Sequence, residues 1–140
     1  MEFYISIIIF SLILLVFTLI ELVKKHNATK DPTIRKLRSW LYHIEPKTKR
    51  VGIYEDPDYA YIVNKRDIYI VIKDKNGDYY DDNTLMHVLL HEAAHALNKN
   101  LGHGPKFYRI FYKLKTKARE LGLYDPDKPL NRNYPIKKTK

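Results

Sequence analysis

The sequence contains no cysteine. Disulfide bonds, thiol nucleophiles and thiolate metal sites are therefore excluded, and any metal ligand must be a His, Asp or Glu side chain. Glycine and proline are also scarce, with 5 and 7 among 140 residues, which argues against a long flexible linker. Acidic residues are in deficit, because 25 Lys and Arg accompany only 16 Asp and Glu. This positive surplus indicates an anionic partner, either nucleic acid or an acidic lipid surface.

Charge is absent altogether from residues 3–20, which are mostly Ile, Leu and Phe. Extended to Val23, this run covers the roughly 30 Å of a hydrocarbon core as a helix. A secretory signal peptide would start with basic residues and end at a small-residue cleavage site, but the chain starts with Glu2 and offers a poor cleavage site. A buried core helix would have a polar face, which this run lacks. We therefore predict a transmembrane anchor at residues 1–23, followed by a basic linker at residues 24–32.

The orientation of this anchor follows from the charges that flank it. Nine Lys and Arg but only two acidic residues lie between Lys24 and Arg50. Basic residues beside a membrane span stay on the cytoplasmic side, so we predict a single-pass protein whose C-terminal domain is cytoplasmic. The same segment, residues 24–50, is predicted to contact anionic lipid. The last four residues, 137–140, are similar to a dilysine retrieval signal of the endoplasmic reticulum.

The rest of the chain predicts one small α+β domain at residues 33–124. A first helix is expected from an Asp-Pro start to about His43. Segments 59–63 and 68–72 are rich in Tyr, Ile and Val and predict an antiparallel hairpin. Residues 51–54 are a candidate third strand beside it.

Two further helices are expected after the strands. One covers about residues 85–98, capped by the Asp-Asn-Thr sequence before it, and the other runs from Pro105 to Gly122 with an apolar stripe at helical spacing. Three prolines after Tyr124 predict an extended tail at residues 125–140. The expected architecture is a small antiparallel sheet packed on both of these helices and preceded by one transmembrane helix.

The helix at 85–98 contains the sequence HEAAH, from His91 to His95. Residues four apart on a helix lie on the same face, so both imidazoles can reach one metal ion while Glu92 lies beside a metal-bound water. Zinc suits neutral imidazole ligands in tetrahedral geometry, and it lowers the pKa of bound water. Glu92 is then the expected general base of a hydrolytic reaction. An amphipathic surface helix with incidental histidines is the alternative.

The identity of a third ligand separates the classes of HExxH site. A histidine six residues after the second His is absent, since that position holds Leu101. The only later glutamate is Glu120, at the far end of the last expected helix. His103 is better placed, because the Gly-His-Gly-Pro turn lies between the two helices. The spacing therefore favours His103 over Glu120 as the third ligand.

The HEAAH helix and the following GHGPKF segment resemble the SprT-like and WLM group of small zinc metallopeptidases. The resemblance covers about Tyr59 to Tyr124 and is greatest to short metallopeptidase-like proteins of large DNA viruses. It implies a minigluzincin-like fold, Zn²⁺ bound by His91, His95 and His103, Glu92 as base and peptide hydrolysis. It also implies that Phe107 packs in the core and seats His103.

The predicted function is a membrane-anchored zinc metalloprotease that hydrolyses extended protein or peptide substrates. The alternative is a non-catalytic, membrane-tethered basic module that binds anionic lipid or nucleic acid and contains structural zinc, for which His87 is a candidate fourth ligand. His87 is otherwise a candidate neighbour of the zinc site. Tyr134, in the tail, is a candidate oxyanion stabiliser. The basic face of the last helix is a further candidate surface for nucleic acid.

Overall fold

The computed structural model describes residues 1–136, so the dilysine-like segment at 137–140 lies outside the described residues. Within that range the chain is α+β, with four helices and a small three-stranded mixed sheet. In chain order the elements are α1 (Glu2–Asn27), α2 (Pro32–Ile44), the short 3-10 helix η1 (Pro46–Arg50), β1 (Gly52–Glu55), β2 (Tyr61–Val63), β3 (Asp67–Ile70), α3 (Asp82–Leu97) and α4 (Pro105–Glu120).

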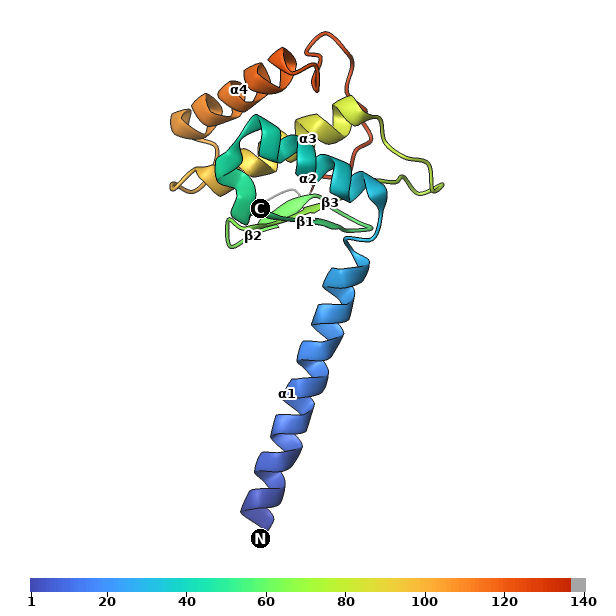
Figure 1. Ribbon diagram of the computed structural model, residues 1–140, viewed down its shortest axis with the longest axis vertical. Helices are drawn as coiled ribbons and strands as arrows, with labels where there is room; N and C mark the ends of the chain where they lie inside the picture. The colour runs from blue at the N-terminus through green and yellow to red at the C-terminus, as the bar shows by residue number, and fades with distance from the viewer. Residues whose placement is uncertain (137–140) are drawn as a thin grey trace.

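The domain is layered, and α1 projects from it (Figure 1). One face of the sheet is covered by α2, which packs on β1, and by α3, which packs on β2 and β3. Helix α4 packs on α3 at the side away from the sheet. The sheet therefore lies between α1 and the helical layers, and its second face is turned to the side from which α1 extends (Figure 1).

The expectation of an antiparallel sheet is wrong, because the sheet is mixed. Its strand order is β1-β3-β2, with β1 parallel to β3 and β2 antiparallel to β3. The hairpin of β2 and β3 forms as predicted, but β3 lies at the centre of the sheet, between β1 and β2. Ile68 and Ile70 of β3 are fully buried, so this most apolar strand is covered on both edges. Strand β1 then runs in the same direction as β3.

The helices begin and end close to the predicted positions, with one change of cap. Asp31 caps α2 by accepting a hydrogen bond from the backbone N–H of Thr33 at 2.8 Å. The cap of α3 is Asp81, which accepts from the N–H of Thr84 at 2.9 Å, so α3 begins at Asp82, earlier than expected. Both caps satisfy backbone donors that a helix start leaves without an intrahelical partner.

The hydrophobic core unites three helices with the sheet. Its fully buried side chains come from α2, β1, β3, the segment after β3, α3 and α4; the largest of them are Ile34, Leu37, Leu41, Ile53, Ile68, Ile70, Ile72, Leu85, Met86, Leu89, Leu90 and Phe107. Helix α2 therefore contributes three of these side chains, although only α3 and α4 were expected to cover the sheet. Each such side chain contributes about 1.5–3 kcal/mol when it leaves water.

Helix α1 has no buried residue, and by length and composition it is apolar enough to cross a membrane. It extends to Asn27, four residues into the segment expected to be a linker. Its end is attached to the sheet, because Lys25 Nζ lies 3.1 Å from Asp67 Oδ2 and the N–H of Glu55 donates to the carbonyl of Ala28 at 2.7 Å.

Candidate metal centre

Two of the predicted ligands lie on one face of α3. His91 and His95 are one helical turn apart, and their ring centroids are separated by 5.0 Å. Both side chains are partly buried. Helix α3 therefore presents two imidazoles side by side at its C-terminal half, as the four-residue spacing predicts.

The third imidazole comes from the loop that joins α3 to α4. Gly102 has φ +75°, a left-handed conformation in which a residue with a side chain is strained. The chain turns back at this glycine, and Pro105 then begins α4. His103 lies between them, with its Nε2 atom 2.9 Å from Nε2 of His95 and 3.1 Å from Nε2 of His91.

The candidate ligand atoms of the three imidazoles all lie within 4.8 Å of one another, and this arrangement fits a tetrahedral metal ion. Zinc–nitrogen bonds of about 2.0–2.1 Å separate two tetrahedral ligands by about 3.3 Å, so a shift of a few tenths of an ångström admits the ion. Within residues 1–136, the one group of three or more side chains that could hold a metal ion consists of His91, His95 and His103. His103 is exposed, which leaves the cluster open to solvent on one side. Glu120 is not a member of this group.

Phe107 lies beneath the three imidazoles. Its ring centroid is 4.4 Å from that of His95, 4.7 Å from that of His103 and 5.0 Å from that of His91. The side chain is fully buried in the first turn of α4. Phe107 therefore limits the rotation of each ring from below and joins the third ligand to the core.

The environment keeps the helix imidazoles neutral. Burial, together with the charges of the neighbouring histidines, lowers the pKa of His91 to about 4. Burial and the charges of His103 and Lys65 also lower the pKa of His95. Only a neutral imidazole has a lone pair for a metal, so both side chains are in the ligating form at neutral pH.

Glu92 follows His91 on α3 and is buried. Burial raises the pKa of its carboxyl group to about 7, because a charged carboxylate is disfavoured outside water. A carboxyl group with a pKa near the working pH can both accept and return a proton. These are the properties that a general base at this position requires.

His87 does not join the three-histidine cluster. Its Nδ1 atom lies 3.3 Å from the hydroxyl of Tyr124, and its ring contacts that of Phe111 at 5.4 Å. Burial lowers its pKa, and the charge of Lys115 adds to this effect. Electrostatic repulsion from the protonated form of His87 is the smallest of the causes that lower the pKa of His91.

The tail lies over the domain, and Tyr134 is buried. Its hydroxyl oxygen accepts a hydrogen bond from the backbone N–H of Val71 at 2.9 Å. Burial raises its pKa, and the charge of Glu92 is a further cause, so the phenol lies within electrostatic reach of the candidate base. The tail also forms a parallel bridge between Ile136 and Ala60, just before β2.

Lys65, which no sequence pattern singles out, supports the loop that carries His103, the third candidate ligand. Asn64 and Lys65 both have positive φ, at 50° and 53°, and form the β2–β3 turn. Lys65 Nζ donates to the backbone carbonyls of Asn98 and Asn100, directly after α3. The hairpin of segments 59–63 and 68–72 implies a turn between them, but the sequence carries no signal that a residue of this turn contacts a loop more than thirty residues further along the chain.

Two curated viral proteins are similar to this chain. The chain is 50% identical over 87 residues to uncharacterized protein 136R of invertebrate iridescent virus 6, an alignment that covers 60% of this chain and 48% of that protein. It is 43% identical over 83 residues to uncharacterized protein 042R of invertebrate iridescent virus 3, covering 59% of this chain and 52% of that protein. The chain thus spans about half the length of the curated relatives it matches.

No family model matches the chain. No solved structure matches it either. The names of the two viral relatives specify no activity. The geometry of the site itself is therefore the basis for inferring the function of this protein.

Proposed function

We propose that this chain is a membrane-anchored zinc metallopeptidase of the SprT-like type. The observation that carries the proposal is the convergence of three imidazoles, in which Nε2 of His103 lies 2.9 Å from Nε2 of His95 and 3.1 Å from Nε2 of His91. Two of these residues belong to an HExxH sequence whose glutamate is buried on the same helix. Three protein ligands with one side left open are typical of a catalytic metal site, because a structural zinc site is usually closed by four protein ligands.

Each residue has a role in peptide hydrolysis. His91, His95 and His103 would hold the ion, which when bound supplies a Lewis acid that polarises a carbonyl and lowers the pKa of water. Glu92 takes the proton of the attacking water and returns it to the leaving amine. Burial of Glu92 and Phe107 excludes bulk solvent from one side of the cluster.

Extended peptide is the proposed substrate class. Strand β2 is an edge strand of the sheet, and an edge strand offers backbone groups with which an extended segment can pair. The tail pairs at Ala60, before β2 begins, so the part of the edge left to a substrate is Tyr61–Val63. The hairpin turn that follows contacts the loop of His103 through Lys65, which brings this edge towards the metal centre.

Helix α1 is the proposed single-pass anchor, with the C-terminal domain in the cytoplasm. Its apolar length and the basic residues that follow it support this topology. Protease protection in sealed vesicles tests it. We expect the C-terminal domain to be digested from the cytoplasmic side, and protection of that domain would contradict the proposed orientation.

The alternative, a non-catalytic module with structural zinc, requires a closed site with four protein ligands. The group formed within residues 1–136 has three members, and His87 contacts Tyr124 instead. The geometry therefore favours the catalytic proposal. Nucleic-acid binding by the basic face of α4 has no separate support from the contacts of that helix.

Metal analysis of the purified full chain tests the proposal. We expect one zinc ion per chain, and a loss of at least tenfold in affinity for each of His91→Ala, His95→Ala and His103→Ala. His43→Ala is the matched control, because His43 is exposed and bonds only to its own helix at Ser39. Wild-type protein without stoichiometric metal, or equal loss in the control, would refute the proposed site.

A further inference from the structure

The outer face of the sheet, which is turned away from α2 and α3, carries a row of tyrosines. Ile53 and Ile68 point into the core, so their neighbours Tyr54 and Tyr69 point outwards. The rings of Tyr54 and Tyr69 are stacked at 5.3 Å, and those of Tyr69 and Tyr61 at 4.8 Å. Tyrosine is typical of the boundary between a membrane and water, where its ring is in contact with lipid and its hydroxyl with water.

A cavity of about 830 Å³ lies at the edge of this face and is rich in positive charge. Its wall includes one carboxylate, Asp67, and five basic side chains, which are Lys25, Arg38, Lys49, Arg50 and Arg66. The basic residues come from the end of α1, from α2, from η1 and from the β2–β3 turn. The fold therefore gathers charges that are far apart in the sequence.

Most of this positive charge is not neutralised by the protein. Asp67 is paired with Lys25 at 3.1 Å, and Glu21, near the end of α1, is paired with Lys24 at 3.0 Å. Within residues 1–136, no ion pair is formed by Arg38, Lys49, Arg50 or Arg66. Like charges gathered in one cavity repel each other unless an anion is bound among them.

The cavity lies next to the point where α1 leaves the domain. Lys25 lines it and is two residues beyond Val23, the end of the apolar run. The same lysine lies over the ring of Tyr54, 5.2 Å from its centroid. If α1 spans a bilayer, the cavity and the tyrosine row are therefore at the level of the lipid headgroups.

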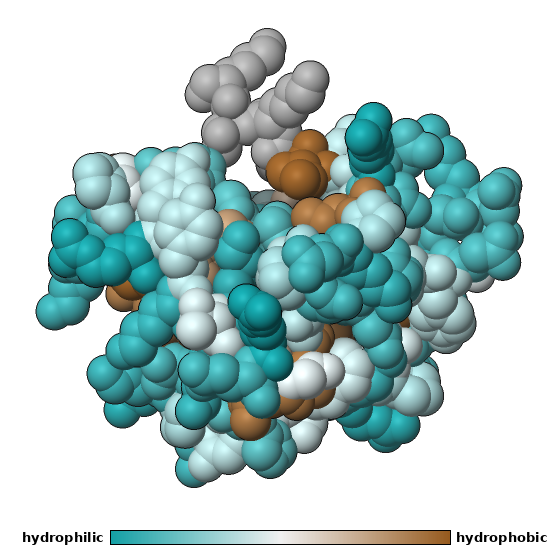
Figure 2. All heavy atoms as spheres, turned by 90° about the horizontal axis from the view of Figure 1, so that it is seen from above, coloured by the Kyte–Doolittle hydropathy of each residue, from teal (hydrophilic) through white to brown (hydrophobic). Residues whose placement is uncertain are grey.

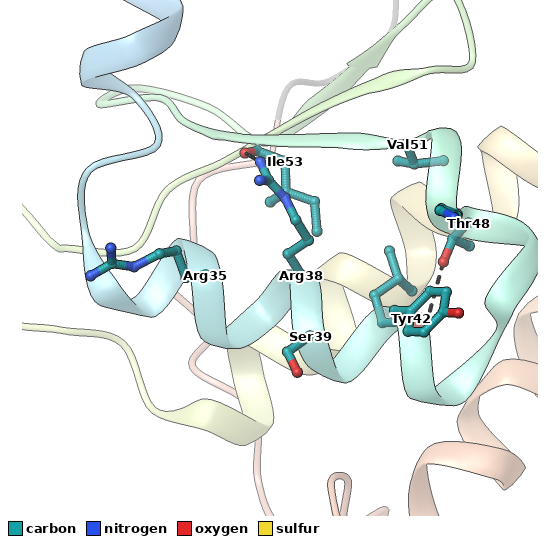
Figure 3. A pocket seen from close by; sticks show the side chains of 9 residues that line it. Arg35, Arg38, Ser39, Tyr42, Thr48, Val51 and Ile53 are labelled. Atoms are coloured by element: carbon teal, nitrogen blue, oxygen red, sulfur yellow. Dashed lines mark hydrogen bonds between the residues drawn. The ribbon is translucent and has the colours of Figure 1, made fainter.

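A second cavity, of about 400 Å³, adjoins the first between α2, η1 and β1 (Figure 3). It is lined by the apolar side chains of Leu41, Val51 and Ile53, and Arg38 belongs to the walls of both cavities. The guanidinium of Arg38 is held there, because it donates to the backbone carbonyl of Ile53 at 3.2 Å. An apolar surface beside a basic one suits a lipid better than a free inorganic anion.

The opposite side of the domain differs. Figure 2, which views the molecule from the side away from α1, shows a mostly hydrophilic surface with small apolar patches. Helices α3 and α4, which with their connecting loop carry the candidate metal centre, lie on the covered side of the sheet (Figure 1). Contact of the outer sheet face with a bilayer would therefore leave the metal centre facing the aqueous phase.

We propose that the basic cavity binds the phosphate of an anionic lipid headgroup in the bilayer that α1 spans, and so holds the outer face of the sheet on the membrane. The inference rests on the proposed insertion of α1 and is independent of the peptidase activity. The binding site is built by tertiary structure, since Arg66 belongs to it although it lies outside the basic segment at residues 24–50.

The test uses the full chain reconstituted in phosphatidylcholine vesicles with spin-labelled phosphatidylserine as the probe. Electron paramagnetic resonance measures the fraction of probe that the protein immobilises, relative to spin-labelled phosphatidylcholine. We expect the wild-type chain to select phosphatidylserine and Arg50→Gln/Arg66→Gln to lose this selectivity by about fivefold or more, since each basic residue near the surface contributes on that scale. Arg109→Gln/Arg119→Gln is the matched control, with the same charge change on exposed residues of α4.

The outcomes separate the sources of the anion and the two proposals. Equal loss in both double variants, or no loss in either, would overturn the site. Displacement of the probe by inorganic phosphate, but not by chloride at equal ionic strength, would overturn the lipid assignment in favour of free phosphate. Extraction of the chain by alkaline carbonate would overturn both the anchor and this inference, whereas a lack of zinc would overturn only the peptidase.

Discussion

The ring of Phe107 lies 4.4 Å from the imidazole of His95 although the two residues belong to different helices. The same phenyl ring contacts the other two imidazoles of the cluster at 4.7 and 5.0 Å. The packing of α4 on α3 and the positions of the three candidate ligands therefore both depend on the same side chain. A change at Phe107 must affect both.

Phe107→Leu is expected to weaken zinc binding while the domain stays folded. Leucine keeps most of the apolar volume, but it leaves the three rings free to rotate, and loss of such support typically reduces metal affinity by about 10–100-fold. Zinc affinity by competition with a chromogenic chelator measures the effect. Phe107→Ala should in addition destabilise the fold by about 3–5 kcal/mol. Unchanged affinity in the leucine variant would contradict the supporting role.

Glu92→Gln is expected to retain zinc and to lose peptide cleavage by at least about 10²-fold, because the amide cannot take a proton from water. Cleavage of an unstructured protein such as casein, with zinc content measured in parallel, tests this. Glu120→Gln is the control, since Glu120 is exposed at the far end of α4. Activity in the Glu92 variant would refute the assigned base.

Lys65→Met is expected to loosen the loop that carries His103. Two hydrogen bonds from the ammonium group to the carbonyls of Asn98 and Asn100 would be lost. A hydrogen bond to a charged group contributes about 1.5–3 kcal/mol to stability. Faster amide hydrogen exchange in residues 98–104 and weaker zinc binding are the expected results. Lys75→Met, in an exposed turn, should change neither measurement.

The folded protein is expected to lose stability in acid because of the environment of Asp31. Burial alone would raise its pKa, but hydrogen bonds from Thr33, Tyr79 and Lys73 outweigh burial and lower it. Because the folded pKa is below the unfolded value of about 3.9, the stabilisation is complete above that pH and is lost as pH falls through the folded pKa. Asp31→Asn keeps a capping side chain but no charge. Urea unfolding of the full chain in detergent should show the two proteins diverging at pH 7 and converging as the pH falls through the folded pKa of Asp31.

Part of the fold could be predicted from local pattern. The helices and the hairpin were recognisable from signals that act within a few residues. These signals are Asp31 followed by Pro32, the start at Pro105, and the Tyr-, Ile- and Val-rich segments 59–63 and 68–72. The parallel pairing of β1 with its neighbour β3 could not be predicted in this way. Whether β1 pairs in parallel or antiparallel depends on which strand occupies the centre of the sheet. Burial of Ile68 and Ile70 on β3 decided that.

The features of the candidate site likewise divide into those that follow from local sequence and those that depend on long-range packing. Local sequence accounts for which side chains are available, because the spacing of His91 and His95 on a helix and the glycines around His103 act through local geometry. Long-range packing places Phe107 against all three rings, Lys65 against the loop of His103, and Arg66 beside Arg50 near α1. These contacts depend on the packing of elements distant in sequence, and packing is set by the shape of the whole core, which no local pattern encodes.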